Sequence, residues 1–147
     1  QTKNIKYGGR IKNVTKETGD VLIDSKLVSE MKKAGTKFTE RNLKFVVKNS
    51  EGKIIFLEKG NINSGLEHIM EGKWSNKTNF QKLFNNSVDE MINNIYKAIK
   101  NEKYIKKIID DKNRISYIYK IKTTQGLREF KIATGSNGYI VSFIPNW

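Results

Sequence analysis

The chain contains a single histidine, His68, in 147 residues. Imidazole has an unperturbed pKa of about 6.5, so it can both accept and donate a proton near neutral pH. Ser64, Trp74 and Thr78 lie close to it in the sequence and carry hydroxyl or aromatic groups. A lone histidine is more often a structural or surface residue than a catalytic one. The alternative is general acid and base chemistry.

Metal-free cleavage of RNA requires three kinds of group. A base must take the 2′-hydroxyl proton, an acid must protonate the leaving 5′-oxygen, and a cation or hydrogen-bond donors must stabilise the charged phosphorane. His68 is the one residue of this chain whose type suits the first two roles at neutral pH. If the chain cleaves RNA without a metal, His68 is therefore central.

The charge of the chain favours a polyanionic partner. Lys and Arg number 28 against 15 Asp and Glu, which leaves a net charge of +13. Like charges repel one another and destabilise the compact state, and binding to phosphates compensates because it also releases counterions. RNA, DNA and anionic membrane all qualify, although scattered lysines make a membrane surface the weakest candidate. Alternatively, the lysines only solvate the surface of a Lys- and Asn-rich chain.

Composition also limits the cofactors. The chain has no cysteine, which excludes a disulfide framework, a zinc knuckle and a thiol nucleophile. One histidine makes a His-based metal site unexpected, so we expect no metal and no other cofactor. No apolar stretch approaches the roughly 20 residues of a membrane helix. Because the chain begins with Gln1 and has no signal-peptide core, we expect it to be a terminal module of a longer protein.

The N-terminal half predicts a linker, a helix and a hairpin. Residues 1–20 are polar and weakly patterned, so we expect a linker or a loosely packed entry segment there and one domain over 21–147. Ser25 is the predicted cap of a short helix that ends at Gly35. The runs 43–48 and 53–58 are β-branched and aromatic, and Asn49-Ser50-Glu51-Gly52 between them is typical of a hairpin turn.

The middle of the chain predicts three helices. Residues 64–71 contain His68, with Ser64 and Glu67 spaced as a capping box. Ser87 and Glu90 form a second capping box before residues 88–100, whose apolar side chains fall on one helical face. A further short helix is expected from about Glu102 to Ile109.

The last third predicts an antiparallel meander of strands at 115–122, 127–133 and 139–144. In the last strand, alternation puts Ile140, Ser142 and Ile144 on one face, and Tyr139, Val141 and Phe143 on the other. Helices followed by a meander predict an α+β fold, in which the helices pack on one face of a twisted antiparallel sheet.

Two segments resemble a known family. GLEHI (65–69), with KW at 73–74 and NFQKLF at 79–84, resembles the Gly-Leu-x-His-Ile segment of the barnase/EndoU/colicin D/RelE-like (BECR) nucleases. GYIVSFIPNW (138–147) resembles the closing strand of their EndoU-like toxin members. The resemblance implies a ribonuclease toxin domain, as found at the C-termini of contact-dependent growth inhibition proteins and other polymorphic secreted proteins. Such domains cleave RNA, commonly tRNA, in the cytoplasm of a target cell.

The resemblance also implies roles for single residues. His68 corresponds to the acid/base histidine of the family. Many relatives have a second histidine a few residues later, and this chain has none. Lys73 is the nearest basic replacement, but it would need a strongly lowered pKa to act as a base. Otherwise Glu67 or Glu71 shares the proton transfer, or His68 acts alone.

On the closing strand, the resemblance implies that Ser142 first and Tyr139 second contact the scissile region. Thr134 and Ser136, predicted to lie in the turn at the same end of the sheet, are candidate donors to phosphate. For Ser136, ordinary turn chemistry is the stronger alternative, and Tyr139 is equally well explained as a packed aromatic residue.

The basic residues of the meander are candidates for substrate binding. They are Lys120, Lys122, Arg128 and Lys131, which would follow an RNA backbone as one stripe if the strand register allows it. Trp74 or Tyr117 is available to stack on a base. The expected partners are RNA, an acidic immunity protein and, in some cases, a host activating factor. The alternatives are a non-catalytic nucleic-acid binding module, a DNase toxin, or an adhesive segment of a secreted protein.

Overall fold

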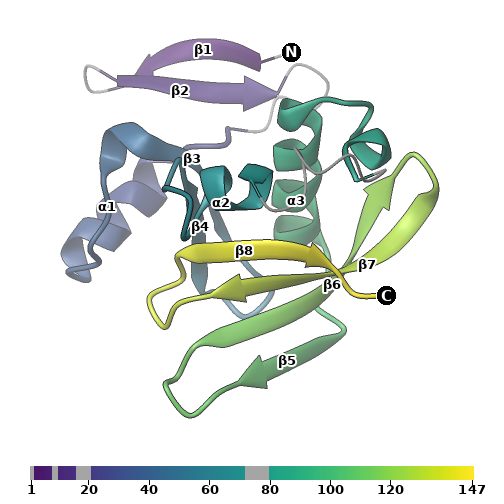
Figure 1. Cartoon of the computed structure of the whole chain (residues 1–147). Coiled ribbons are helices and arrows are strands. Elements are labelled where there is room, and N and C mark those ends of the chain that lie inside the picture. Colours follow the sequence, from purple (N-terminus) through teal and green to yellow (C-terminus); the bar gives the residue numbers. More distant parts are fainter. Residues whose placement is uncertain (1, 8–9, 16–20, 72–79) are drawn as a thin grey trace.

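The computed structural model describes residues 2–7, 10–15, 21–71 and 80–147, with side chains from residue 21 onward. It confirms the predicted α+β fold (Figure 1). The helices are α1 (Ser25–Lys33), α2 (Leu66–Ile69) and α3 (Val88–Asn101), and the 3-10 turns are η1 (Glu40–Asn42) and η3 (Gln81–Phe84). The strands are β1 (Thr2–Tyr7), β2 (Arg10–Thr15), β3 (Leu43–Lys48), β4 (Ile54–Glu58), β5 (Lys106–Ile109), β6 (Ile115–Thr123), β7 (Gly126–Thr134) and β8 (Ile140–Pro145).

Helix α3 is the element that local sequence specifies best. The side chain of Ser87 accepts a hydrogen bond from the Glu90 amide at 3.1 Å, as a helix cap requires. The stripe of Met91, Ile92 and Ile95 is buried in the main core together with Ile99. Both the predicted start and the predicted apolar face of this helix are confirmed.

The N-cap of helix α1 lies one residue before the predicted cap, Ser25. Asp24, not Ser25, accepts the amide hydrogen of Lys26 at 2.8 Å, so Ser25 is the first residue of the helix. The predicted end is confirmed, because Gly35 adopts a left-handed φ of +73°.

The β3–β4 hairpin is buried on both faces, which explains why its strands are almost continuously apolar. Phe45 and Val47 belong to the main core, which contains α3 and the sheet β5–β8. Val46 and Phe56 belong to a second, smaller core with α1. The predicted hairpin and its turn at residues 49–52 are confirmed.

Strands β6, β7 and β8 form the predicted antiparallel meander, and β5 adds a fourth strand beside β6, so that the spatial order is β5-β6-β7-β8. At its β8 end the meander adjoins the β3–β4 hairpin, because the Phe56 amide donates to the Gly138 carbonyl at 2.9 Å. Gly138 has a φ of +92°, and a Cβ there would lie 2.1 Å from the Ile54 carbonyl oxygen. This close approach of two backbones requires glycine.

The prediction of a helix from Glu102 to Ile109 is wrong. Helix α3 ends at Asn101, and the Ile105 amide then donates to the Ile118 carbonyl at 2.7 Å. Strand β5 follows and pairs with residues 115–118 of β6. Pairing with a neighbouring strand outweighs the helical spacing of a short segment whose apolar residues are isoleucine and tyrosine, both good strand formers.

The predicted alternation along β8 is also wrong at its start. The register shifts between Ala133, which pairs with Ser142, and Thr134, which pairs with Ile140. One extra residue, Val141, therefore bulges, so that Ile140 and Phe143 both face the main core. Ser142 and Ile144 remain together on the outer face, but without Ile140.

Residues 1–20 contain an element that the sequence analysis did not predict. Strands β1 and β2 pair with each other as an antiparallel hairpin, in register from Thr2↔Thr15 to Tyr7↔Arg10. The division into a linker over 1–20 and a domain over 21–147 stays a prediction. Among the helices that the structure describes, none is both long and apolar enough to cross a membrane.

Candidate active site

His68 lies on α2, a single helical turn at the end of a tight loop. The predicted capping box at the start of this helix is wrong, because Gly65 is the N-cap residue and no side chain caps the helix. The hydroxyl of Ser64 is instead hydrogen-bonded to the hydroxyl of Tyr139 at 3.0 Å. A residue predicted to start the helix thus joins the His68 loop to the region where β8 begins.

One backbone carbonyl orients the imidazole of His68. Its Nδ1 lies 2.7 Å from the carbonyl oxygen of Ile62. A carbonyl oxygen can only accept, so Nδ1 carries the hydrogen of this bond and the lone pair of the neutral ring is on Nε2. The side chain is half-buried. A ring held in one tautomer, with Nε2 as its basic atom, is suited to general base catalysis.

The loop that carries Ile62 is itself held in place. The Asn61 amide donates to the Ser64 carbonyl at 2.9 Å, and the Asn63 amide donates to the Asn61 side chain at 2.8 Å. The Gly65 amide donates to the Val141 carbonyl on β8 at 3.0 Å. Backbone hydrogen bonds therefore fix the position of His68 relative to the start of β8.

Tyr139 comes from a segment far from His68 in sequence. Its ring packs edge-on against Phe56, with 5.7 Å between centroids, and is half-buried. Its hydroxyl reaches Ser64 on the His68 loop. Ser142 takes a different position, half-buried on the outer face of β8 opposite Ala133. Of the two hydroxyl residues predicted on this strand, Tyr139 is the one bonded to the His68 loop.

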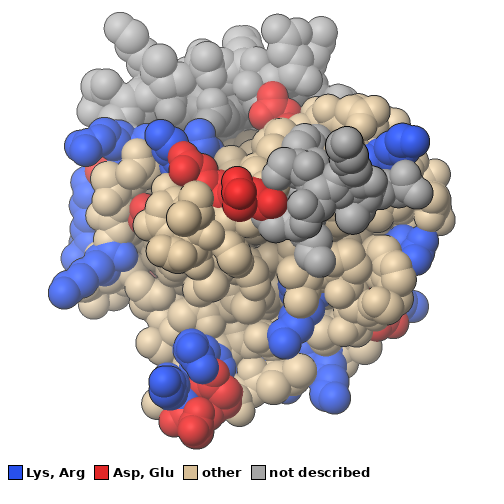
Figure 2. Space-filling model, viewed as in Figure 1, with Lys and Arg blue, Asp and Glu red and all other residues tan. Residues whose placement is uncertain are grey.

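Acidic side chains lie on and just after the helix that carries His68. Figure 2 shows red side chains over α2, above a largely uncharged area over β8 with Lys and Arg at its margins. Glu67 pairs with Lys59 at 3.6 Å, and the Glu67 amide donates to the Lys59 carbonyl at 2.9 Å. Glu71 follows the C-cap residue of the helix, Met70. The predicted residues Lys73 and Trp74 lie outside the described residues.

Thr134 does not serve as the predicted phosphate donor. It is the last residue of β7 rather than part of a turn, and it is 2% exposed. Its hydroxyl donates to the Ile115 carbonyl at 2.7 Å. Ser136 is an exposed turn residue whose carbonyl accepts from Lys53 Nζ at 2.9 Å.

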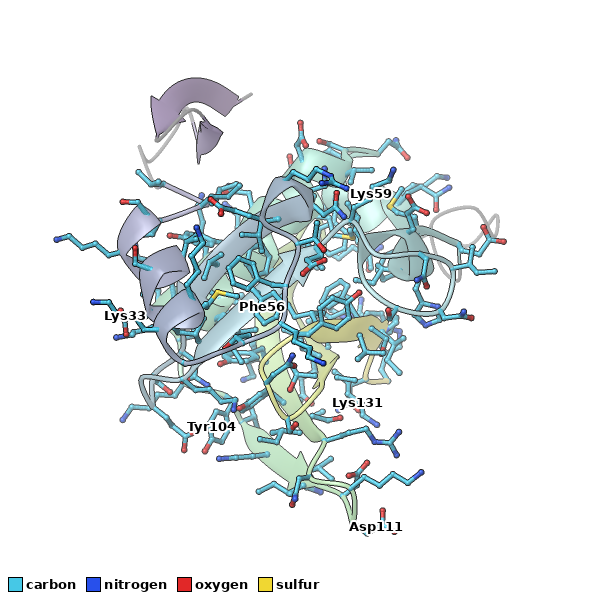
Figure 3. The ribbon with its side chains drawn as sticks, turned by 90° about the vertical axis from the view of Figure 1, so that its left-hand side faces the viewer. Lys33, Phe56, Lys59, Tyr104, Asp111 and Lys131 are labelled. Carbon is cyan, nitrogen blue, oxygen red and sulfur yellow. The ribbon has the colours of Figure 1, made fainter. Side chains whose placement is uncertain are left out.

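The predicted basic stripe is divided between two faces of the sheet. Arg128 pairs with the buried Ile121, which places it on the core side, where it stacks over the Trp147 ring at 4.0 Å. Lys120, Lys122 and Lys131 lie on the other face, because Lys131 pairs with Ile118. Figure 3 shows Lys131 on the sheet, well away from Lys59.

Tyr117 is not available for stacking on a base. It is 1% exposed and packs in the main core against Tyr104 and Tyr119. The prediction failed because alternation shows which side chains share a face of the strand, but not which of the two faces is buried in the core.

Sequence reasoning assigned Ser64 a capping role and missed the Ile62 carbonyl. No pattern signals a backbone carbonyl or a contact between residues 64 and 139. Within the described residues, no group of three His, Cys, Asp or Glu side chains is arranged to hold a metal ion. In the comparisons with known proteins, no family model matches this chain, and no curated protein matches it either.

Proposed function

We propose that this chain is a metal-independent endoribonuclease in which His68 is the general base. The observation that carries the proposal is the 2.7 Å contact between His68 Nδ1 and the Ile62 carbonyl, which leaves Nε2 as the proton acceptor. Among the described residues, a hydrogen-bond partner is recorded for Nδ1 and none for Nε2. The net charge of +13 supports RNA as the substrate.

In the proposed reaction, His68 Nε2 takes the proton of a 2′-hydroxyl, and the 2′-oxygen attacks the adjacent phosphorus. The bond to the 5′-oxygen breaks, which gives a 2′,3′-cyclic phosphate and a 5′-hydroxyl end. The donors proposed for the phosphorane oxygens are the Ser64 hydroxyl on the His68 loop and the Tyr139 hydroxyl that is hydrogen-bonded to it. Glu67, Glu71 and Lys73 are the candidates for the acid that protonates the leaving oxygen.

The biological setting is part of the same proposal. The resemblance of residues 65–84 and 138–147 to BECR toxins supports a tRNA substrate and delivery into the cytoplasm of a competing cell as part of a larger secreted protein. A cognate immunity protein would then be acidic, because it must cover a surface suited to phosphate. A host activating factor is the further partner that the resemblance implies.

The first experiment incubates the purified domain with total cellular RNA in EDTA and maps the ends of the fragments. We expect discrete fragments with 2′,3′-cyclic phosphate ends, and a loss of at least about 100-fold in rate for His68→Ala. Lys33→Ala, which changes an exposed residue at the end of α1, is the control and retains full activity. Equal cleavage by His68→Ala and the wild type would contradict the role of His68.

A non-catalytic RNA-binding module is the second candidate. The acidic side chains around α2 favour it, because negative charge next to His68 weakens the attraction of phosphate to that position (Figure 2). Intact RNA in the first experiment, combined with tight RNA binding, would support this candidate over the nuclease.

A further inference from the structure

An open groove of about 830 Å³ lies between α3 and the β6–β7 hairpin. Polar side chains of α3 form one wall and lysines of β6 form the opposite wall; the residues central to it are Asn93, Asn94, Lys97, Asn101, Lys120 and Lys122. Neither α2 nor β8 contributes to its lining, so the groove is separate from the His68 loop and Tyr139.

The groove exists because β6 is longer than β5. Strand β5 pairs only as far as Ile118, and the next residues of β6 have no strand on that edge. Helix α3 lies beside this open edge (Figure 1), and the Asn94 amide group donates to the Lys122 carbonyl at 3.0 Å. Alternate residues of a strand direct their backbone groups to the same edge. The backbone of Lys120 therefore faces the groove as well.

A buried polar atom on the α3 wall has no partner. Asn93 is 9% exposed, and its Oδ1 makes no hydrogen bond among the described residues. A buried acceptor without a donor is unfavourable, so such atoms are rare in folded proteins. The atom is buried, so rotation of the Asn93 side chain, which lines the groove, would be needed to bring Oδ1 to an N–H group of an occupant. Asparagine side chains commonly bind the edges of nucleobases, which present amino and imino hydrogens.

The lysines of the groove are not neutralised by the protein. Lys97, Lys103, Lys120 and Lys122 make no ion pair within 4.0 Å in the part of the chain that the structure describes. The carboxylates of the groove lie toward the two ends of α3: Asp89 and Glu90 in its first turn, and Glu102 at its C-cap. Lys97 lies on α3 between these two ends, so positive charge predominates in the middle of that wall.

We propose that this groove binds a single-stranded segment of RNA, with phosphates on the lysines and a base edge on Asn93. The inference rests on the RNA substrate proposed above but not on catalysis by His68. Its volume suits a nucleotide or two, and a duplex would need a wider surface. The groove lining contains no aromatic residue among those described, so base contacts would depend on hydrogen bonds and not on stacking. The groove would hold an unpaired part of the substrate away from the scissile bond.

The test measures RNA binding by fluorescence anisotropy, with a labelled unpaired 12-nucleotide RNA and the full chain carrying His68→Ala. The groove variant is Lys97→Gln/Lys120→Gln/Lys122→Gln. The matched control, Lys26→Gln/Lys33→Gln/Lys37→Gln, removes the same charge from exposed positions in and after α1. We expect at least tenfold weaker binding for the groove variant and less than threefold for the control. The slope of log affinity against log salt should fall by about 2, since each phosphate contact contributes roughly 0.7.

Asn93→Leu tests the base contact separately, because leucine has nearly the same size but no acceptor. It should weaken binding of the RNA by about fivefold or more, and leave binding of an abasic strand of the same length unchanged. Equal losses for the groove and control variants would overturn the proposal, since binding would then depend only on total charge. Displacement of the RNA by a glutamate 12-mer at equal charge would also overturn it, in favour of an acidic protein partner.

Measuring RNA binding instead of cleavage tests the groove independently of the proposed nuclease activity. Binding is measured with His68 replaced, so an inactive enzyme does not affect it. Tight groove-dependent binding without cleavage by the wild type would uphold the groove and contradict the nuclease. Cleavage that needs His68 but is unaffected by the groove variant, together with unchanged binding, would contradict only the groove.

Discussion

At the scale of single residues, the candidate site depends on atoms that no side-chain pattern reveals. A backbone carbonyl, that of Ile62, determines which nitrogen of His68 bears the hydrogen. A hydroxyl pair, Ser64 and Tyr139, joins this loop to a residue 75 positions later in the chain. Each of these contacts can be removed by a substitution that changes only a few atoms.

Tyr139→Phe removes the hydroxyl that reaches the His68 loop. If the proposed reaction is correct, we expect the cleavage rate to fall by about 10- to 100-fold, because a donor near the phosphorane and an anchor of the loop are both lost. The substitution also costs about 1 kcal/mol of stability. Single-turnover kinetics with the mapped RNA measures the effect.

Tyr117→Phe is the matched control for that experiment, because it also removes a buried hydroxyl, one without a hydrogen-bond partner among the described residues. It should leave the cleavage rate within twofold of the wild type. An equal loss of rate in both variants would show that the effect of Tyr139→Phe is structural.

The core tyrosines predict a specific response to alkaline pH. Burial raises the pKa of Tyr119 strongly, and the neighbouring Tyr117, Glu51 and Tyr104 raise it further. Above about pH 10 this tyrosine ionises in the unfolded chain but keeps its proton in the folded one. The free energy of unfolding should therefore fall by up to about 1.4 kcal/mol per pH unit for this group, and stay unaffected by it at lower pH.

Urea unfolding of the wild type and Tyr119→Phe at pH 8 and above pH 10 measures this response. Phenylalanine also removes a buried hydroxyl without a hydrogen-bond partner among the described residues, so the variant should be at least as stable as the wild type at pH 8. The difference between the two should grow in favour of the variant above pH 10. If the free energy of unfolding changed equally with pH in both proteins, ionisation of Tyr119 would not be the cause of the loss of stability at alkaline pH.

At the scale of elements, the junction between β4 and β8 holds the two sheets and the His68 loop together. The Phe56 amide bonds to the Gly138 carbonyl on one side, and the Gly65 amide bonds to the Val141 carbonyl on the other. This junction brings Tyr139 next to both Phe56 and Ser64. The position of the candidate site is therefore set where two elements distant in sequence meet.

Gly138→Ala should separate these elements. The new Cβ would meet the Ile54 carbonyl oxygen at 2.1 Å, and the residue has a φ of +92°. Gly126→Ala is the control, because Gly126 has a similar φ of +89° but open space around it. The control should cost about 1 to 2 kcal/mol from backbone strain alone.

Gly138→Ala should cost at least about 2 kcal/mol more than the control, because the backbones must move apart. Urea unfolding of the two variants gives the comparison. Equal destabilisation would mean that the β4–β8 contact relaxes easily and does not fix the site.

At the scale of the whole molecule, the net charge of +13 affects stability and binding in opposite directions. Self-repulsion opposes folding of the free chain, whereas phosphate binding uses the same charges. Salt screens both effects. We therefore expect the melting temperature of the free domain to rise between 10 and 150 mM NaCl, while its affinity for RNA falls.

Differential scanning fluorimetry and anisotropy over one salt series test this pair of trends. The same series with sucrose in place of salt is the control, because sucrose does not screen charge. A melting temperature that falls with salt would show that attractive ion pairs, such as those of Lys32 with Glu40 and Lys48 with Glu30, outweigh the repulsion.

The sequence by itself determined the elements whose signals are local. Helix α3 follows from a cap at Ser87 and an apolar stripe, and the β3–β4 hairpin follows from two apolar runs around a turn. The meander and the α+β fold follow from alternation in the last third. In each case the residues that specify the element lie close together in the sequence. The element therefore does not depend on contacts with a distant part of the chain.

Only the tertiary structure decided the remaining features. The segment before β6 becomes β5 because it pairs with β6, and Val141 bulges where the register of β7 and β8 shifts and its carbonyl accepts from the Gly65 amide. The Ser64–Tyr139 contact, the burial of Thr134 and the groove beside α3 arise in the same way. Their energies come from contacts between residues far apart in the chain, and periodicity along the sequence carries no information about such contacts.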